Sequence, residues 1–356
     1  MGLLAGLGLA LGLLLSGCAS QILARQIVKA PNRGGVPREL RDIEKLAVAD
    51  GVYMEAWRSP VGPPSGELAV GVVDSADYHF VYEVEVKYRR DSDDKTESVE
   101  GFGLKWNCNP KEKKPLALAN TPKATLVLLH GIMMTKESML PWAFFFAQQG
   151  YRVVLVDLRG HGRSTGRWIG FGAWEADDLV KVTDELQRRG VLVGKLGVFG
   201  QSYGAAVGIQ WAARDPRVAT VVALAPFSDP QAAIREFARG FNPKLAAKLS
   251  DETFATAETR AAAMAGFAWS GLNVVEAMER VRVPVLFFHG KFDTWILPAH
   301  SEALERAAPT GSRREVTPHD NHMSLMVRFD LIGPPALAWF DERLRDSAVP
   351  SSVALK

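Results

Sequence analysis

Gly200-Gln201-Ser202-Tyr203-Gly204 is the stretch that decides the fold of this chain. This G-x-S-x-G pentapeptide follows a short apolar run, residues 196–199, which is typical of a buried strand. Residues 205–214 come next and have the composition of a helix. A serine on a sharp turn from strand to helix exposes its hydroxyl above the sheet, and the two glycines let the backbone turn without a Cβ clash. The pattern therefore predicts that Ser202 is a nucleophile.

The rest of the chain supplies partners for this serine. A serine hydroxyl needs a base within hydrogen-bond reach, and the base needs an orienting acid. Asp293 follows the apolar run 283–288, so its carboxylate is expected at the carboxyl end of a strand, where ligands bind in open α/β sheets. His322 lies further on, between a strand-like run at 314–317 and a final helix. Nucleophile, acid and base therefore occur in that order along the chain.

Alternatives remain open for the acid and the base. Asp229 follows another apolar run, residues 218–225, and is the alternative acid. His319 lies just before His322 and is the alternative base. The histidines at strand ends and in glycine-rich turns are expected to order loops, and they are His130, His161 and His289.

The pattern around the serine extends over most of the chain. From residue 125 onward, strand and helix patterns alternate, which predicts a mostly parallel central sheet with helices on both faces. Residues 67–107 alternate apolar and polar side chains, so we expect N-terminal antiparallel strands that extend one edge of the sheet. Between residues 229 and 282 only helical patterns occur, which predicts a helical cap insertion. Its aromatic residues are expected to form the core of the cap or to line an acyl pocket, and they are Phe237, Phe241, Phe254, Phe267 and Trp269.

Four further segments resemble the α/β-hydrolases, in particular the monoacylglycerol-lipase and serine-aminopeptidase-like branch. Residues 126–131 resemble the strand and His-Gly pair that open the oxyanion loop, and residues 153–164 resemble the strand followed by D-x-R-G-H-G-x-S. Residues 289–298 resemble the acid loop, with the proline one place later than in the family pattern. Residues 322–325 resemble the histidine loop. The resemblance implies an α/β-hydrolase fold.

The same resemblance implies a reaction. Ser202 would attack an acyl carbonyl, His322 would take and return the proton, and Asp293 would hold the imidazole in the required tautomer. The expected activity is cleavage of carboxylic esters through an acyl-enzyme, without a cofactor. A serine peptidase or amidase on small peptides, an acyltransferase and a non-catalytic envelope protein that reuses the fold are the alternatives. The backbone N–H groups expected to hold the oxyanion are those of Tyr203 and of Ile132 or Met133.

The N-terminus predicts export and lipid attachment. Residues 2–15 are apolar or glycine, which is short of the ~20 apolar residues of a membrane-spanning helix and fits the core of a secretory signal. No Lys or Arg precedes this core, unlike in most such signals. Leu15-Ser16-Gly17-Cys18 resembles a bacterial lipobox, in which Cys18 receives a diacylglyceryl group and becomes the first residue. A plain signal peptide, an uncleaved anchor and a cytosolic protein are the alternatives.

The residues after Cys18 bear on the location of the protein. Ala19-Ser20 lacks the acidic residue that often retains lipoproteins in the inner membrane. We therefore expect a membrane-anchored protein of the cell envelope, with the outer membrane slightly favoured in a cell with two membranes. Acylation of Cys18 would leave Cys108 without a second cysteine, so no internal disulfide is expected.

Composition excludes several other function classes. The 42 basic and 40 acidic residues give a net charge of +2, which offers no basic footprint for nucleic acid. The sequence contains no phosphate-binding loop of the G-x-x-x-x-G-K-[ST] type. It also contains no H-E-x-x-H and no paired-cysteine motif, so no metal is expected. The expected partners are a small-molecule ester or peptide substrate and the membrane, with the oligomeric state left open.

The expected divisions of the chain are a signal peptide (1–17), a lipid-anchored tether with a small helix (18–66), the α/β-hydrolase domain (67–345, cap at about 229–282) and a tail (346–356).

Overall fold

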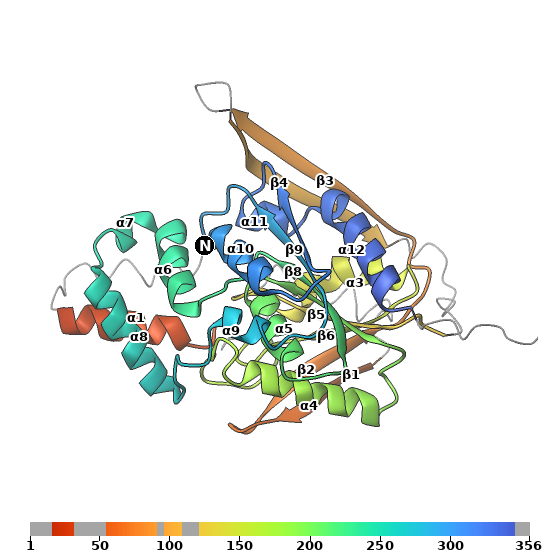
Figure 1. Cartoon of the computed structure of the whole chain (residues 1–356), viewed down its shortest axis with the longest axis horizontal. Coiled ribbons are helices and arrows are strands. Elements are labelled where there is room, and N and C mark those ends of the chain that lie inside the picture. Colours follow the sequence, from red (N-terminus) through yellow and green to blue (C-terminus); the bar gives the residue numbers. More distant parts are fainter. Residues whose placement is uncertain (1–15, 32–54, 91–95, 109–120, 346–356) are drawn as a thin grey trace, which may run out of the picture.

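A central sheet organises the molecule (Figure 1). The computed structural model describes residues 16–31, 55–90, 96–108 and 121–345. The six C-terminal strands are mutually parallel, and β2 and β1 continue the sheet in antiparallel fashion beyond β6. The eight strands lie in the order β1-β2-β6-β5-β7-β8-β9-β10. Their bounds are β1 Glu55–Val61, β2 Gly66–Val73, β5 Thr125–Leu129, β6 Arg152–Val156, β7 Leu196–Gln201, β8 Val218–Leu224, β9 Val285–Gly290 and β10 Arg313–Thr317.

Helices cover both faces of this sheet because the central strands are apolar on both sides. The strands β5, β7 and β9 are buried at every position, as expected for parallel strands between two helical layers. One face packs against α3 (Leu140–Ala147, after the short η2, Lys136–Met139) and α12 (Phe329–Arg343). The other face packs against α4 (Glu175–Arg188), α5 (Tyr203–Ala212) and α10 (Ala299–Ala307). The predicted α/β class and its mostly parallel sheet are confirmed.

The N-terminal strands only partly follow the prediction. β2 extends the edge of the sheet as expected, but β3 (Phe80–Arg90) and β4 (Glu97–Cys108) form a separate two-stranded sheet. The expectation that all of residues 67–107 extend the edge is therefore wrong. The physical reason is the single apolar face of the hairpin, which packs on α3 and α12. The ring of Phe80 lies 5.9 Å from that of Phe144, and the ring of Tyr82 lies 5.3 Å from that of Phe329.

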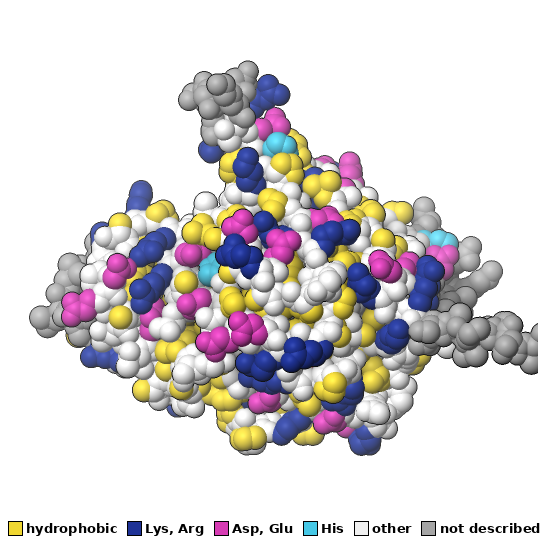
Figure 2. Space-filling model, in the orientation of Figure 1, with side chains coloured by type: hydrophobic (Ala, Val, Ile, Leu, Met, Phe, Trp, Pro, Cys, Tyr) yellow, Lys and Arg dark blue, Asp and Glu magenta, His cyan; other side chains and the backbone are white. Residues whose placement is uncertain are grey.

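The two edges of the central sheet have a polar character. The edge strand β10 presents Arg313, Arg314 and Glu315 in succession. The opposite edge strand, β1, contains Arg58 and a proline at position 60, which has no N–H to donate. On the face of the molecule that Figure 2 shows, basic and acidic side chains are interspersed.

The described residues between β8 and β9 form helices and no strand, which confirms the predicted helical cap. The helices are α6 (Pro230–Phe241), α7 (Pro243–Ala246), α8 (Asp251–Ala265) and α9 (Val274–Met278). Helices α6, α7 and α8 gather at one side of the molecule, away from α12 and α3 (Figure 1). None of the helices in the described ranges combines the length and apolar character needed to cross a bilayer.

The segment expected to be a tether is partly structured. Helix α1 (Ser16–Val28) lies against α8 of the cap, and Glu55–Val61 is strand β1 of the central sheet. The chain after Cys18 is thus held against the cap, because the helix has an apolar face that α8 covers. The small helix expected at residues 39–49, the apolar run 2–15 and the tail 346–356 lie outside the described residues.

Candidate active site

Ser202 sits at a sharp turn between β7 and α5. Its backbone angles are φ 49° and ψ −110°, which a residue with a Cβ adopts only under strain that the surroundings must hold. The flanking glycines are needed for close approach. A Cβ on Gly200 would lie 2.6 Å from the Cα of Ala205, and a Cβ on Gly204 would lie 2.5 Å from the carbonyl oxygen of Leu129. The sequence pattern is therefore explained by geometry, and the turn lifts the serine hydroxyl above the sheet.

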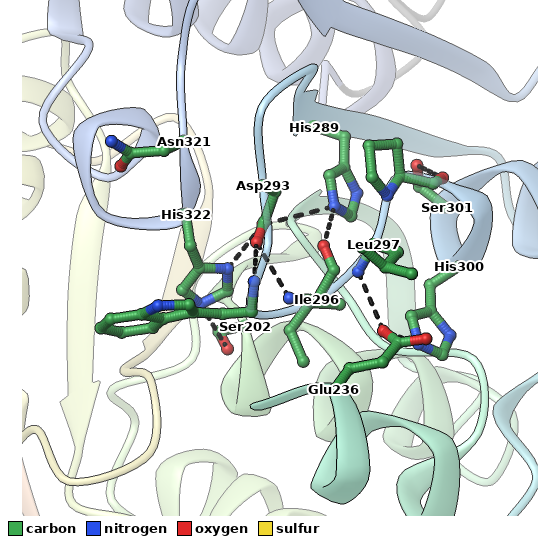
Figure 3. A network of polar contacts seen from close by, with 12 residues as sticks. Ser202, Glu236, His289, Asp293, Ile296, Leu297, His300, Ser301, Asn321 and His322 are labelled. Atoms are coloured by element: carbon green, nitrogen blue, oxygen red, sulfur yellow. Dashed lines mark hydrogen bonds and ion pairs between the residues drawn. The ribbon is translucent and has the colours of Figure 1, made fainter. Parts of the chain in front are cut away.

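The structure brings the three predicted residues of the site together (Figure 3). His322 Nε2 lies 3.0 Å from Ser202 Oγ, and His322 Nδ1 lies 2.6 Å from Asp293 Oδ2. Because a carboxylate only accepts, Nδ1 carries the proton and Nε2 accepts from the serine hydroxyl. The exposed fractions of Ser202, Asp293 and His322 are 7, 2 and 6 %. The hydrogen-bonded chain is thus shielded from most of the solvent.

Asp293 accepts three hydrogen bonds and lies close to a second histidine. Its Oδ1 accepts the N–H groups of Trp295 and Ile296, both at 2.9 Å. Its Oδ2 accepts from His322 and lies 3.4 Å from His289 Nε2. Burial by itself raises the pKa of this carboxyl, but the polar contacts with His289 and His322 outweigh it and leave the pKa below its ordinary value. Asp293 is therefore ionised and can stabilise a positive imidazole.

The predicted oxyanion donors belong to the start of α5 and to the loop after β5. Tyr203 is the first residue of α5, and an N–H in the first turn of a helix has no intrahelical acceptor. A Cβ on Gly131 would lie 3.7 Å from the Cβ of Ser202, so the 131–133 loop runs beside the nucleophile. Met133 in this loop has φ 65°. Tyr203 thus follows the nucleophile directly in the chain, and Ile132 and Met133 follow Gly131, which lies beside it.

The Tyr203 side chain fixes the start of α5. Its hydroxyl donates to Glu175 Oε1 and accepts the N–H of Phe171, both at 2.9 Å. Burial, together with the nearby Glu175 carboxylate, raises the pKa of Tyr203 well above its ordinary value. The phenol thus stays neutral and anchors the first turn of α5 to the loop before α4.

His130 and His161 order the loops beneath the serine. His130 Nε2 accepts the N–H of Leu158 at 3.0 Å, so its Nδ1 donates to the Gly131 carbonyl at 2.8 Å. His161 Nδ1 lies 2.9 Å from the carbonyl oxygen of Arg159. Burial lowers the pKa of His130 to about 4 and, chiefly by the same cause, that of His161 to about 3. Both are neutral members of the scaffold, in the positions expected of loop-ordering groups.

The alternative acid and base have other partners. Asp229 caps α6 by accepting the N–H groups of Gln231 and Ala232. His319 Nδ1 donates to the Glu97 carbonyl at 2.9 Å, and its ring lies 5.5 Å from that of Tyr88 on the β3–β4 hairpin. The structure therefore does not bring Asp229 or His319 into the chain of hydrogen bonds at Ser202.

A second polar network joins the cap to the loop that carries Asp293 (Figure 3). Glu236 on α6 accepts the N–H of Leu297 at 3.0 Å and a hydrogen bond from His300 Nε2 at 3.0 Å. His300 Nδ1 in turn accepts the N–H of Ser228 at 3.1 Å and lies 2.7 Å from its hydroxyl. Burial raises the pKa of Glu236, yet these hydrogen bonds hold it below its ordinary value. Sequence reasoning missed this network because no local motif marks Glu236 or His300.

Two aromatic side chains of the cap pack against Trp295 of the acid loop, which lies next to the histidine. Phe237 and Phe241 stack at 5.2 Å, and both meet Trp295 edge-on at 5.4 and 5.5 Å. The Trp295 ring lies 5.5 Å from that of His322. A Cβ on Gly240 would overlap the Thr294 carbonyl oxygen, so α6 touches the acid loop directly. The other predicted cap aromatics, Phe254, Phe267 and Trp269, belong to the core or pack against it.

A buried ion pair between Asp320 and Arg328 lies close in sequence to the base. Asp320 accepts two hydrogen bonds from Arg328 Nη1, both at 3.0 Å, and one from Ser324. Asp320 is buried and, through Ser324, supports the short helix α11 (His322–Leu325), which begins with the base. Within the described ranges, no group of three or more His, Cys, Asp or Glu side chains is placed to hold a metal ion.

Sequence comparisons match the central part of the chain. Residues 120–250 match the model of the serine aminopeptidase family, S33. An uncharacterized Bacillus subtilis protein, YqkD, is 28% identical over 189 residues, which are 52% of this chain and 60% of that protein. The thiohydrolase aneE of Aspergillus aculeatus is 29% identical over 145 residues, 38% of this chain and 44% of that protein. The chain thus spans 60% or less of the length of these curated relatives.

Solved structures share the fold over a larger part of the chain. An esterase of Pyrococcus furiosus superposes with a TM-score of 0.58 at 18% identity, over 89% of this chain and 98% of its own. A 2,6-dihydroxy-pseudo-oxynicotine hydrolase superposes with a TM-score of 0.57 at 16% identity, over 86% of this chain and 72% of its own. At these identities the likeness concerns the fold. Residues 120–250 therefore resemble the serine aminopeptidase family, and the chain has the α/β-hydrolase fold with a nucleophile elbow at Ser202.

Proposed function

We propose that this α/β-hydrolase cleaves carboxylic esters through an acyl-enzyme on Ser202. The observation that carries the proposal is the chain of hydrogen bonds from Ser202 Oγ through His322 to Asp293, at 3.0 and 2.6 Å, on a strained elbow. A buried nucleophile, a base in contact with it and an ionised acid behind the base are the parts that acyl transfer requires.

In the first half of the reaction, Ser202 Oγ attacks the ester carbonyl while its proton passes to His322 Nε2. Asp293 remains ionised, because its pKa is low, and stabilises the imidazolium that forms. The oxyanion is held by backbone N–H groups, that of Tyr203 and that of Ile132 or Met133. One such donor contributes roughly 10²–10³ in turnover in enzymes where it has been removed.

The second half returns the enzyme to its starting state. His322 gives its proton to the leaving alkoxide, the C–O bond breaks and the acyl group stays on Ser202. A water then attacks the acyl carbon, His322 takes its proton, and the carboxylic acid leaves. Trp295 over the imidazole limits the access of solvent during these steps.

The choice of ester over amide rests on the chemistry of the cap and on the names of similar proteins. Phe237, Phe241 and Trp295 give an apolar approach to the site, which suits an acyl or alcohol group without charge. Two of the similar proteins are described as an esterase and a thiohydrolase. The description of the matching family model, serine aminopeptidase, favours a peptidase or amidase on small peptides as the second candidate. A non-catalytic envelope protein is the remaining alternative.

Labelling with a fluorophosphonate tests the nucleophile. We expect the purified protein to be labelled and Ser202→Ala to remain unlabelled. Ser228→Ala is a matched control, because Ser228 also touches a histidine that contacts a carboxylate, but it lies off the elbow. The control should label like the wild type. Loss of labelling in Ser228→Ala with retention in Ser202→Ala would overturn the assignment, and a folded but unreactive wild type would favour the non-catalytic alternative. Turnover of p-nitrophenyl esters against aminoacyl-nitroanilides then separates ester from amide cleavage.

We further propose that the mature protein is a lipoprotein of the cell envelope. The lipobox-like Leu15-Ser16-Gly17-Cys18 supports this, and the exposure of Cys18 at the start of α1 is compatible with a modified thiol. An alkyne fatty acid fed to expressing cells should enter the wild type and not Cys18→Ser. Equal incorporation in both would exclude this cysteine as the acylation site. The preference for the outer membrane is tested by fractionation of the two membranes.

A further inference from the structure

Helix α1 is fixed to the cap on its inner side. Ser20, Ala24 and Ile27 follow one another at helical spacing and are buried. Arg260 on α8 donates to Ser20 Oγ at 2.8 Å. At the end of α1, the Val28 carbonyl accepts the N–H of Ile169, and the N–H of Ala30 donates to the Arg167 carbonyl. Helix α1 is therefore packed into the folded molecule from Ser20 onward, which is two residues after Cys18.

The outer side of α1 carries a different set of residues. Cys18, Ile22 and Arg25 on α1 are exposed, and so is Lys29, the residue after its end. Their spacing of four, three and four residues puts them on one face, because the Lys29 N–H still bonds to the Arg25 carbonyl. Ile22 is a large apolar side chain with 45% exposure. The face therefore combines the predicted acylation site, an apolar side chain and two cations in one line.

A groove continues this face onto the body of the protein. Its volume is about 310 Å³. The guanidinium of Arg167 lies 4.8 Å from the centre of the Trp168 ring. Among the described residues, no carboxylate forms an ion pair with Arg25, Lys29 or Arg167. The groove is lined by Gln21, Ile22, Arg25, Arg167, Trp168 and Met264.

We propose that the outer face of α1 and the adjoining groove bind the surface of a phospholipid bilayer that contains anionic lipids. The three cations, which have no carboxylate partner in the described part of the chain, favour anionic headgroups. Ile22 and Trp168 have the apolar and amphipathic character of groups that enter the headgroup region. The proposal identifies a membrane-contacting surface, which a lipid on Cys18 alone does not require.

The position of Cys18 determines the distance to the bilayer if the thiol is acylated. Ser20 is buried and lies two positions after Cys18 in the same helix, so the two residues are only about 3 Å apart along the helix axis. This is within the Debye length of roughly 8–10 Å at physiological ionic strength, so the cations would act on the headgroups without much screening. Helix α1 would lie along the membrane, between the bilayer and α8 of the cap.

Binding to vesicles tests the surface without the lipid and without the enzymatic reaction. The protein to use is the chain from residue 18 onward with Cys18→Ser, which keeps every described element apart from the first two residues of α1. Flotation with vesicles of phosphatidylcholine and phosphatidylglycerol should show binding that weakens with added salt. Vesicles of phosphatidylcholine alone should bind much less.

Two triple variants locate the effect. The first is Arg25→Gln, Lys29→Gln and Arg167→Gln, and we expect it to bind about a hundredfold more weakly, since each cation near an anionic surface contributes about fivefold. The control changes net charge equally at exposed cations elsewhere and should bind like the parent. Equal binding of the two variants, equal loss in both, or no binding of the parent would each overturn the proposal. Retained circular dichroism and fluorophosphonate labelling show that both variants are folded. The control substitutions are Lys87→Gln, Arg89→Gln and Arg306→Gln.

Discussion

Acidification should destabilise this protein through two buried histidines. Burial lowers the pKa of His130 to about 4 and that of His161 to about 3, from 6.5 in the unfolded chain. Between these values the unfolded chain binds protons that the folded protein does not, so the free energy of unfolding falls as the pH decreases below 6.5. The loss at low pH amounts to about 3 kcal/mol for His130 and about 5 kcal/mol for His161, at 1.36 kcal/mol per pKa unit. Part of the lowered pKa of His161 comes from His130, whose ring lies 4.9 Å away, so the two losses are not independent.

The assay is urea-induced unfolding at a series of pH values from 7 down to 4. His161→Asn removes one titrating group and keeps a side-chain donor for the Arg159 carbonyl. We expect the variant to lose stability less steeply with acid than the wild type, by up to about 1.4 kcal/mol per pH unit. His79→Asn is the control, because His79 is exposed and its positive φ suits asparagine. Parallel curves for the wild type and His161→Asn below pH 6.5 would refute the reasoning.

Three other changes follow from the packing. Gly240→Ala places a methyl group against the acid loop and should lower kcat/KM for a soluble ester by roughly 10–100-fold; an unchanged value would show that α6 does not constrain the loop. Asp320→Asn leaves buried Arg328 without its buried carboxylate partner and should lower the free energy of unfolding by about 3 kcal/mol. The control Asp330→Asn changes an exposed partner of the same arginine and should lower it by less than about 1 kcal/mol. Similar losses in the two variants would contradict this. Deletion through Ala30 removes α1 and its buried face, so Tm should drop by several degrees. Deletion of residues 1–17 should leave Tm unchanged. Equal Tm values for the two shortened proteins would contradict a stabilising role of α1.

The sequence was sufficient for the parallel part of the fold and for the geometry around Ser202. Parallel strands end at one edge of the sheet, so Asp293 and His322 could be expected to meet the serine once their strands were recognised. Asp229 and His319 satisfied the same local rules, and they differ only in the partners that their side chains meet, a helix end and a hairpin carbonyl.

The features missed by sequence analysis depend on contacts between distant segments. Glu236 and His300 are 64 residues apart, and neither stands in a recognisable pattern. The docking of α1 on α8 joins residues 240 apart in the chain. The hairpin of β3 and β4 has the alternation of an edge strand, and only the aromatic surface of α3 and α12 determines where it packs. Periodicity predicts that a face is apolar, but it does not identify the surface that covers it.

The polar edges of the central sheet limit how copies of this protein can associate. A strand at an edge offers unpaired N–H and C=O groups to another chain, and charged residues or proline at that position oppose the pairing. The edge strand β10 has three consecutive charged residues, and β1 has Arg58 and a proline two positions later. Dimers that continue the sheet across two molecules are disfavoured at both ends. The polar ends of the central sheet therefore also resist intermolecular aggregation when the protein is concentrated.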